Sequence, residues 1–510
     1  MAVASYKLQV DWSDDGDFLD VGESIAIGRV RRIDCFRGRD NASQLTGRSI
    51  AGRLMAVLDN RSGDYNSFNT GSPIAGNMLP GREVRLLGTS AGLTDQPIWR
   101  GFLLRIIPQP ITGGDNVVLL EAVGPLGQIN LDQIALGMKT ARRTDLLIGD
   151  LLDDAGWPAA ARSLDVGQTT ITRYWADRQY PLNAIQQVED AEAGFLWETD
   201  DGKIGFKERR ARLSGAALTS QATFSDAAAA AKPYSAIEQL DPLDSIFNLF
   251  EAEIQLYTVG ALATLWTLAE SGASSPLITP NGGSLTFWAR YPNPISPTDA
   301  FAVDVWTTPV ATTDYTANSA ADGSGTNLTS SIAIVATKFS NSMKLVVTNN
   351  HASTAAYLTL LQARGTPVLG KDPVVVRAEN TASQTSYGER LWPARSRFIP
   401  TTAEGQDWAD FHLSIYKDPI AMLSMSFFAN RSQAMLDEML TRDIGDRVTV
   451  VAQNKADLDI NRDFFIEAIR HEINNDRLHN VTFLLSDAEQ FSDFWVLGTS
   501  TLGNNTRLAY

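Results

Sequence analysis

Residues 47–86 read GRSIAGRLMAVLDNRSGDYNSFNTGSPIAGNMLPGREVRL, and this stretch decides the fold of the N-terminal part of the chain. An apolar-rich run leads into a long polar loop that ends in Leu79-Pro80-Gly81-Arg82, where a second β-prone run begins. Loop residues such as Gly, Pro, Asn and Ser between two such runs predict two strands joined by a loop. The stretch contains no pair of catalytic groups.

The neighbouring segments carry the same β pattern. In YKLQVDW, residues 6–12, apolar and polar residues alternate, which is typical of a half-buried strand. Further strand candidates, separated by Gly, Pro or Asn clusters, are residues 52–59, 82–88, 97–106 and 116–123. Five or more strands with turns between them predict a small barrel or sandwich.

The totals limit the classes of protein that this chain can belong to. A chain of 510 residues is too long for one core, so roughly three or four domains are expected. A net charge of −16 argues against a surface that grips nucleic acid as a whole. It suits either simple solubility or a passage whose walls repel the DNA that slides through it.

The numbers of cysteines and histidines, together with the hydropathy, argue against a disulfide-bonded, cysteine-ligated or membrane-spanning protein. One cysteine, Cys35, allows neither an intramolecular disulfide nor a cysteine-based metal site, and the four histidines show no ligand spacing. The N-terminus does not have the pattern of a signal peptide. The longest mostly apolar run, residues 257–268, is too short to cross a bilayer, so we expect no membrane-spanning segment and synthesis in the cytoplasm.

Residues 141–240 have a mixed α and β pattern. Thr144 is expected to cap a helix from Asp145 to about residue 155, and a second helix is expected from Leu182 to Ala193. The alternating runs on either side of residues 200–202, Asp-Asp-Gly, predict a hairpin, since Gly adopts positive φ at little cost.

The strand pattern returns after residue 245. Residues 270–375 are rich in Thr, Ser, Asn and Gly with short apolar runs, which indicates a β-sandwich inserted into a second barrel that resumes near Val374. One helix is expected at about residues 432–441. The predicted fold is therefore mainly β with an α+β segment, in these parts: a first tube-like β-barrel at 1–130, an α+β domain at 131–240, a second tube-like β-barrel at 241–269 plus 376–490, an inserted β-sandwich at 270–375, and a C-terminal arm at 491–510.

Gly88-Thr89-Ser90-Ala91-Gly92 matches the G-x-S-x-G pattern of serine hydrolases. That chemistry needs the serine on a strand-to-helix turn, but Pro97 and the β-prone run after Gly92 leave no room for a helix. We therefore expect a hairpin loop, and neither a catalytic residue nor a cofactor is predicted.

An acidic segment near the N-terminus resembles a calcium loop. The candidate metal ligands are Asp11, Ser13, Asp15, Asp17 and Glu23, with Gly16 at the sharp turn. The final glutamate is one position late, because Gly22 occupies position 12, and no flanking helices are predicted. A solvated acidic turn is the favoured interpretation.

Two further groups of residues are candidates for binding. Arg37, Arg39, Arg48 and Arg53 form a local basic patch that could pair with acidic residues across a subunit contact, or could be scattered surface arginines. Trp288 and Trp306 lie in the predicted sandwich. An exposed tryptophan can stack on a sugar ring, but a tryptophan in a sandwich is more often part of the core.

Three blocks of the chain resemble the minor tail, or tail-tip hub, proteins of siphophages. They are residues 10–106, with VDWSDDGDFLDVGE, QLTGRSIAGRL and NMLPGREVRL; residues 318–366, with NSAADGSGTNLTSSIAIVATKF; and residues 437–510, with DEMLTRDIGDRVTVV and VTFLLSDAEQFSDFWVLGTSTLG. The resemblance implies two tube-like β-barrels per chain, so that a homotrimer forms a ring of pseudo-six-fold symmetry that matches a hexameric tail tube.

The same resemblance implies the function and the partners. The protein is expected in the virion tail as a structural, non-enzymatic baseplate hub. It would contact the tail tube or a distal tail protein above, and a fibre, spike or tape-measure protein below. DNA would pass the lumen without specific binding. The alternative is a tail protein that binds a host-surface glycan or receptor through residues 270–375.

Overall fold

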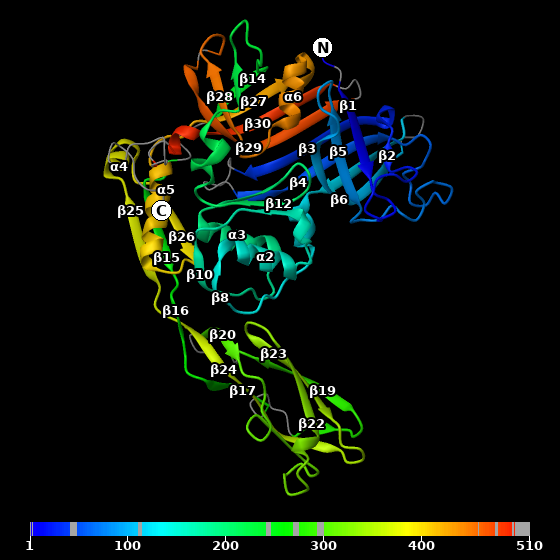
Figure 1. Cartoon of the computed structure of the whole chain (residues 1–510), viewed down its shortest axis with the longest axis vertical. Coiled ribbons are helices and arrows are strands. Elements are labelled where there is room, and N and C mark those ends of the chain that lie inside the picture. The colour runs from blue at the N-terminus through cyan, green and yellow to red at the C-terminus, as the bar shows by residue number, and fades with distance from the viewer. Residues whose placement is uncertain are drawn as a thin grey trace.

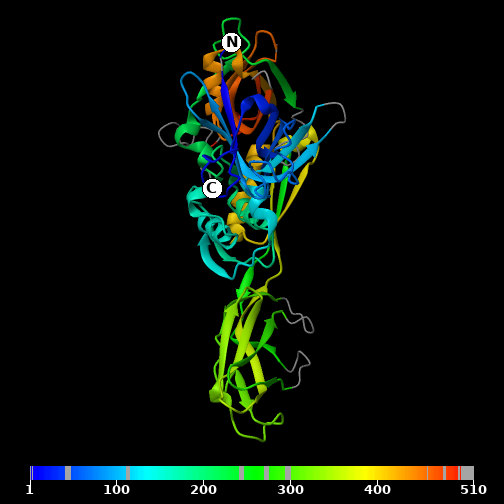
Figure 2. The same cartoon turned by 90° about the vertical axis from the view of Figure 1, so that its right-hand side faces the viewer.

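The computed structural model describes residues 2, 4–40, 48–110, 115–240, 246–268, 275–292, 300–456, 458–474, 478–491 and 494. A broad body forms one end of the molecule, and a narrower module projects from it along the long axis in both views (Figures 1 and 2). The chain is mainly β with an α+β segment, which confirms the predicted fold class.

Thirteen strands of the body form one sheet. Their bounds are β1 (Ser5–Val10), β2 (Ser24–Ile25), β3 (Val30–Asp40), β4 (Arg48–Asp59), β5 (Glu83–Thr89), β6 (Gln96–Gln109), β7 (Val117–Val123), β13 (Ala222–Ser225), β14 (Ala236–Leu240), β27 (Met422–Phe428), β28 (Arg447–Ala452), β29 (Ile460–Asn474) and β30 (His479–Asp487). The order is β14-β27-β30-β29-β3-β4-β7-β6-β5-β1-β2, with β28 beside β29 and β13 beside β28.

Strand β29 joins the N-terminal and C-terminal strands into this single sheet. Its first half pairs with β28, where Arg447 lies opposite Phe465, and its second half pairs with β3, where Gly38 lies opposite Ala468. Strands from both predicted barrels therefore share one sheet and one apolar core, and the path of this sheet is not closed within the described residues. The physical reason is the length of β29, 15 residues, which gives one edge room for two partners.

The α+β region lies below the large sheet in Figure 1. Its elements are α1 (Pro125–Gln128), β8 (Lys139–Arg143), α2 (Thr144–Asp154), β9 (Arg162–Leu164), β10 (Thr170–Tyr174), α3 (Pro181–Glu192), β11 (Phe195–Glu198) and β12 (Ile204–Lys207). The β11–β12 hairpin and both longer helices are as predicted. Thr144 does not cap α2 but is its first helical residue, and its hydroxyl donates to Glu192 Oε2 at 2.8 Å.

A three-stranded sheet and its covering helix differ from the prediction. The sheet contains β25 (Val374–Glu379), β15 (Leu249–Ile254) and β26 (Leu391–Ser396), and α5 (Thr402–Tyr416) packs against it after the short α4 (Thr381–Tyr387). Strands β15 and β25 lie in segments that were predicted to belong to the second barrel. They belong instead to a second apolar core, which they share with α2 and α3, because their buried faces meet α5 rather than β27–β30.

The projecting module consists of two sheets around a third core. One sheet contains β16 (Tyr257–Val259), β17 (Ala263–Thr267), β18 (Leu277–Ile278), β20 (Ala300–Trp306), β21 (Tyr315–Asn318) and β24 (Ala356–Gly370); the other contains β19 (Gly283–Arg290), β22 (Ile332–Lys338) and β23 (Ser342–Asn349). Strand β24 is the spine, since all five other strands of its sheet pair with it. The module thus begins near residue 257, before the predicted boundary at 270.

The remaining elements are one helix of the body and short 3-10 helices, of which η7 lies in the module and the others in the body. Helix α6 (Gln433–Thr441) begins after Ser432, whose side chain accepts a hydrogen bond from the Met435 N–H. The 3-10 helices are η1 (Ile27–Arg29), η2 (Ile129–Leu131), η3 (Ala159–Ala161), η4 (Ala211–Leu213), η5 (Gly215–Leu218), η7 (Thr329–Ser331), η8 (Ala429–Arg431) and η9 (Ala488–Phe491). Most of the predicted arm at 491–510 lies outside the described residues. Within them, no helix is long and apolar enough to span a bilayer.

Candidate functional site

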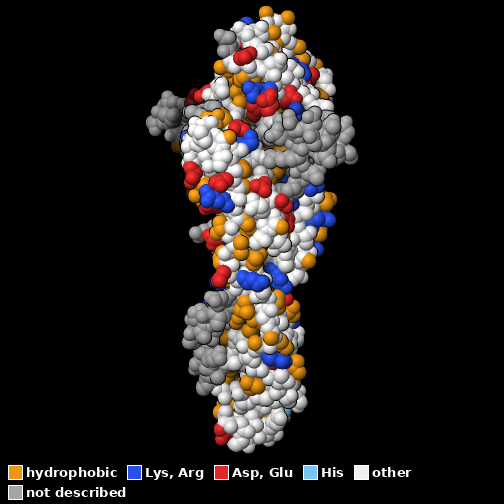
Figure 3. Space-filling view, turned by 90° about the vertical axis from the view of Figure 1, so that its left-hand side faces the viewer, with side chains coloured by type: hydrophobic (Ala, Val, Ile, Leu, Met, Phe, Trp, Pro, Cys, Tyr) orange, Lys and Arg blue, Asp and Glu red, His pale blue; other side chains and the backbone are white. Residues whose placement is uncertain are grey.

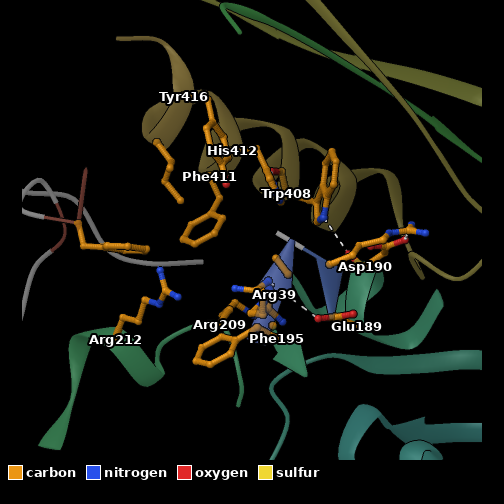
Figure 4. A pocket seen from close by; sticks show the side chains of 15 residues that line it. Arg39, Glu189, Asp190, Phe195, Arg209, Arg212, Trp408, Phe411, His412 and Tyr416 are labelled. Atoms are coloured by element: carbon orange, nitrogen blue, oxygen red, sulfur yellow. Dashed lines mark hydrogen bonds and ion pairs between the residues drawn. The ribbon is translucent and has the colours of Figure 1, made fainter. Parts of the chain in front are cut away.

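A small cavity of about 80 Å³ lies where the N-terminal strands, the α+β region and helix α5 meet (Figure 4). Strand β3 contributes Arg39, the end of α3 contributes Glu189, and η4 contributes Arg212. The opposite wall is the aromatic face of α5. The volume holds a few water molecules and is well below the ~300–1,000 Å³ of typical small-molecule sites. We call this cavity and its charged walls the central junction.

Glu467 of β29 is the central anion of the junction. It is completely buried and receives Arg212 at 2.6 Å and Arg39 at 3.4 Å, while the Ser486 hydroxyl donates to it at 2.5 Å. Burial alone would raise the pKa of Glu467, but the two arginines outweigh burial and the pKa is lowered. Glu467 is therefore ionised and holds two segments from distant parts of the chain.

The ring of Phe195 contacts the same two arginines. The guanidinium carbons of Arg39 and Arg212 both lie 5.0 Å from its centroid, and Arg212 also lies over the rings of Phe465 and Phe491. Contacts of a cation with aromatic faces are stabilising, and more so where water is excluded. The aromatic rings thus supply part of the solvation that the buried arginines lose.

Glu189 is the unusual member of the junction. Its Oε1 accepts from the Leu196 N–H at 2.8 Å and lies 4.0 Å from Arg39, whereas its Oε2 has no hydrogen-bond partner among the described residues. Burial raises the pKa of Glu189 to about 7, with Arg39 acting in the opposite direction. This carboxyl therefore titrates near neutral pH inside the protein.

A second buried pair lies beside the cavity. Arg209 contacts Glu192 at 3.2 Å and also donates to the Thr169 hydroxyl. Glu192 accepts in addition from the Thr144 hydroxyl and from the Thr169 N–H at 2.7 Å. Because each charge is both paired and hydrogen-bonded, this pair ties α3 to the loops that precede β10 and η4.

Helix α5 closes the junction with aromatic side chains. Trp408 donates its indole N–H to the Asp190 carbonyl at 3.0 Å, and the His412 ring lies 4.0 Å from the Trp408 ring. Burial lowers the pKa of His412 to about 4, so the ring is neutral at physiological pH. A neutral, packed imidazole beside paired charges favours a structural role for the junction over acid–base catalysis.

Three of the four arginines in the predicted basic patch form ion pairs within the chain. Arg37 and Arg39 are buried, and Arg37 pairs with Asp443 while Arg39 pairs with Glu467. Arg48 pairs with Asp190 at 2.5 Å, and Arg53 is exposed. For the first three, acidic partners in the same chain replace the predicted subunit contact, because residues 37 and 39 share the inward face of β3.

Ser90 lies in the hairpin between β5 and β6, as predicted. Its hydroxyl donates to Asp437 Oδ1 of α6 at 2.5 Å, and its N–H donates to the Leu93 carbonyl. The four histidines lie elsewhere, in the module, on α5 and in β29 and β30. The serine therefore anchors the hairpin to α6 through the Asp437 carboxylate, and none of the four histidines lies in this hairpin or on α6.

The acidic N-terminal loop closes on its own hydrogen bonds. The Asp11 carboxylate accepts from the N–H groups of Asp14 at 2.6 Å and Gly16 at 3.0 Å, and Glu23 accepts from the Ser13 hydroxyl. Asp15 and Asp17 accept from backbone N–H groups two residues on. Among the described residues, no group of three or more His, Cys, Asp or Glu side chains is placed to hold a metal ion.

The two tryptophans of the module differ. Trp306 is buried and donates its indole N–H to the Phe339 carbonyl at 2.8 Å, which is the expected core position. Trp288 is 50% exposed, so the core interpretation is wrong for this residue. It stacks on Phe339, with ring centroids 5.8 Å apart.

Sequence reasoning missed most of the central junction. Its unpredicted members are Glu189, Glu192, Arg209, Arg212, Trp408, His412 and Glu467. The one available signal was local: Thr401 followed three residues later by Glu404 is a capping-box pattern, and the Thr401 side chain indeed accepts from the Glu404 N–H. That pattern could have located α5 and its buried face.

No protein-family model and no curated protein sequence matches the chain. Among solved structures, the chain is similar to the tail protein from Neisseria meningitidis MC58, with a TM-score of 0.52 at 9% identity over 95% of this chain and 97% of that one. It is also similar to the 43 kDa tail protein of prophage MuSo2 from Shewanella oneidensis, with a TM-score of 0.49 at 9% identity over 96% and 99% of the two chains. The first likeness shows a shared fold from end to end, and the second is too weak to carry an argument.

Proposed function

We propose that this chain is a structural subunit of a bacteriophage tail, a tail-tip hub protein that assembles as a homotrimeric ring. The observation that carries the proposal is the fold shared with a tail protein along nearly the whole of both chains. The ring would join the tail tube or a distal tail protein to a fibre, spike or tape-measure protein. DNA would pass through its lumen without specific binding, which a net charge of −16 favours.

The large sheet supports the proposed symmetry. The strands β1–β7 form one lobe, and β13, β14 and β27–β30 form another, with the β3–β29 pairing between them. Three copies would present six lobes to a six-fold tube. Open lobes that share an edge replace the two closed barrels expected from the sequence, and ring closure would then depend on contacts between copies.

The central junction suits a part that bears load. Breaking a buried ion pair by removal of one partner costs about 3–5 kcal/mol, so the Glu467 cluster strongly resists separation of β3, β29 and η4. A subunit that transmits force between a tube and a fibre needs its lobes at a fixed angle. The junction provides that rigidity without any chemistry.

Exposed apolar side chains supply candidate contacts for assembly. Phe68, in the loop between β4 and β5, is 91% exposed. Apolar side chains also gather around the neck and the upper module (Figure 3). Exposed apolar residues of the strands there are Val259, Phe301, Val305, Val374 and Val375. Apolar patches of this kind mark interaction surfaces.

Native mass spectrometry and negative-stain microscopy test the proposal. We expect a species of three times the 55.5 kDa chain mass and a ring with a central opening. A strict monomer at every concentration, with no ring in micrographs, would overturn the trimer. For the absence of catalysis, Ser90→Ala should leave every assayed hydrolase activity of the preparation unchanged, and loss of an activity on that substitution would contradict a purely structural role.

A second candidate function is recognition of the host surface by the module. The observation that favours it is the exposure of Trp288, since a large aromatic ring on the outer face of a sheet commonly marks a binding surface. This function can coexist with the structural one. Binding of the labelled full chain to bacterial cells tests it.

A further inference from the structure

A cleft of about 430 Å³ lies between the module and the body. The body contributes Asp177 and Arg178, from the segment between β10 and α3, and the module contributes Trp288, Arg290, Phe339 and Asn341. The Asn341 amide donates to the Asp177 carboxylate across the cleft. Its volume falls within the ~300–1,000 Å³ of sites that take small ligands, unlike that of the central junction.

The floor of the cleft is an aromatic platform on a polar strand face. Strand β19 points Ser284, Thr286, Trp288 and Arg290 outward, and all four are exposed. Trp288 is thus an aromatic residue at a position where the strand pattern calls for a polar one. Its ring stacks on Phe339 with an interplanar angle of 26°, which holds both rings in place. Packing of the module does not require an exposed tryptophan, so a ligand is the simpler explanation.

Two arginines beside the platform have no carboxylate partner within the part of the chain that the structure describes. Arg178 and Arg290 form no ion pair with any described residue, although most arginines of this acidic protein do, as Arg173 does with Asp304 at 2.9 Å nearby. Asp177, the adjacent acid, is engaged by Asn341. A guanidinium left unpaired next to a cleft can bind a carboxylate or a phosphate through two hydrogen bonds.

We propose that this cleft binds an acidic saccharide, a sugar that carries a carboxylate or a phosphate. The C–H face of the sugar ring packs on Trp288, as apolar groups pack on aromatic faces, and its anionic group contacts Arg178 and Arg290. The Asn341 amide lies at the edge of the cleft, where ring hydroxyls need donors and acceptors. The inference rests on the recognition function proposed for the module and names its site and ligand class. It is independent of the trimeric ring.

Calorimetric titration of the full chain tests the proposal with two matched pairs of probes. The acidic probes are a galacturonic acid hexamer and pentamannose 6-phosphate; the neutral ones are the methyl-esterified hexamer and dephosphorylated pentamannose. We expect at least one acidic probe to bind at least tenfold more tightly than its neutral counterpart, and added salt to weaken that binding. Which acidic probe binds separates a carboxylate from a phosphate source.

Substitutions assign the binding to the cleft. Trp288→Ser should weaken acidic-probe binding at least tenfold, Trp288→Tyr should retain most of it, and Arg290→Gln should abolish the preference over the neutral probe. Val335→Ser is the matched control, because Val335 is a 67% exposed apolar residue on the same sheet. It should leave binding unchanged. All three substituted positions are exposed, so the variants are expected to fold.

The outcomes distinguish this inference from the recognition function. If no acidic probe binds, or if Trp288→Ser and Arg290→Gln leave acidic-probe binding intact, the cleft assignment is overturned. In either case, binding of the labelled chain to bacterial cells that survives Trp288→Ser leaves the recognition function standing. Absence of both probe binding and cell binding overturns the two together.

Discussion

The backbone of Gly52 lies directly against the carboxylate of Glu198: its N–H donates to Glu198 Oε2 at 2.8 Å, and a Cβ on residue 52 would lie 2.2 Å from the same oxygen. Glu198 also accepts from the Leu126 N–H, so this single buried side chain ties β11 to β4 and to the start of α1. Burial raises the pKa of Glu198 to about 7. The glycine in SIAGRL is therefore required by a contact from a different region of the chain.

Gly52→Ala is expected to lower the free energy of unfolding by at least ~2 kcal/mol, because the added methyl group displaces a buried, hydrogen-bonded carboxylate. Urea unfolding of the full chain measures the change. Gly149→Ala is the matched control: Gly149 lies inside α2, and a Cβ added there would have nothing within 4 Å, so alanine should raise stability by about 0.5–1 kcal/mol. Equal effects at the two positions would contradict the close approach.

The raised pKa of Glu189 predicts how stability changes with pH. Between its ordinary value of 4.5 and about 7, the folded state keeps a proton that the unfolded state releases, so this residue makes stability fall as pH rises. Glu189→Gln removes the effect. As pH rises across this window, the free energy of unfolding of the variant should increase relative to that of the wild type by up to ~1.4 kcal/mol per pH unit. The difference should persist above pH 7.

Urea unfolding at pH 4.5, 6 and 8 measures the gain of Glu189→Gln. The control is Glu238→Gln, at an exposed carboxylate of β14. A constant difference between Glu189→Gln and the wild type at all three pH values would show that the buried carboxyl does not titrate there.

A buried histidine pair predicts sensitivity to acid. His471 Nδ1 lies 2.9 Å from His479 Nε2, and His479 Nδ1 lies 2.9 Å from the Tyr6 hydroxyl. Burial lowers the pKa of His479 to about 3 and the pKa of His471 well below 6.5, where Arg37 also contributes. Below pH 6.5 the unfolded state binds protons at both histidines, whereas the folded pair stays unprotonated. The free energy of unfolding therefore falls by up to ~1.4 kcal/mol for each histidine with every unit by which the pH is lowered.

His479→Asn tests this explanation. The substitution should lower stability at pH 7. Between pH 6 and pH 4 it should make stability depend less steeply on pH, by an amount that corresponds to about one proton fewer taken up on unfolding. Tyr6→Phe is the control, since it removes the hydroxyl and leaves both imidazoles; it should lower stability with the wild-type slope. Thermal unfolding over this pH range is the measurement, and a slope unchanged by His479→Asn would argue against the pair.

Phe68→Ser separates assembly from folding. The side chain is 91% exposed, so the substitution should change the free energy of unfolding of the chain by less than ~0.5 kcal/mol. If the loop between β4 and β5 contacts another subunit, the same change should weaken association at least tenfold in sedimentation experiments. Val166→Ser, at a 60% exposed site in the α+β region, is the control for a general loss of surface apolarity.

The acidic N-terminal loop gives a prediction about metal. Because Asp11 and Glu23 already accept hydrogen bonds from the loop itself, millimolar calcium should leave the melting temperature unchanged relative to EDTA. Asp11→Ala should lower stability by ~1–3 kcal/mol, since it leaves backbone N–H groups without acceptors. A calcium-dependent rise in melting temperature that Asp11→Ala abolishes would instead establish a metal site.

Local patterns in the sequence predicted local structure well. Alternation of apolar and polar residues located β1, β4 and β5, and the Asp-Asp-Gly turn located the β11–β12 hairpin, because side-chain period along a strand and turn preference are properties of the local sequence. Strands β15 and β25 fall in segments that were assigned to the second barrel, but the structure places them in a different sheet. Their partners lie more than a hundred residues away, and alternation does not say which face meets which layer.

The candidate site could not be read from spacing for the same reason. Arg39 and Glu467 are 428 residues apart, and each looks like an ordinary charged residue in its own segment. Trp288 is the opposite case. Its residue type led to the prediction of a core position, whereas the alternation along its strand places it on the outer face. Only the fold reveals that charged residues are inside and that an aromatic residue is outside.

The pairing of β3 with β29 also has a consequence for biosynthesis. Arg470 and Asp34 contact each other across this pairing at a separation of 436 residues. At a synthesis rate of 5–20 residues per second, the free edge of β3 waits roughly 20 to 90 seconds for its neighbour to leave the ribosome. The first lobe thus leaves the ribosome with one edge of β3 unpaired. That edge can pair with β29 only once nearly the entire polypeptide has been translated.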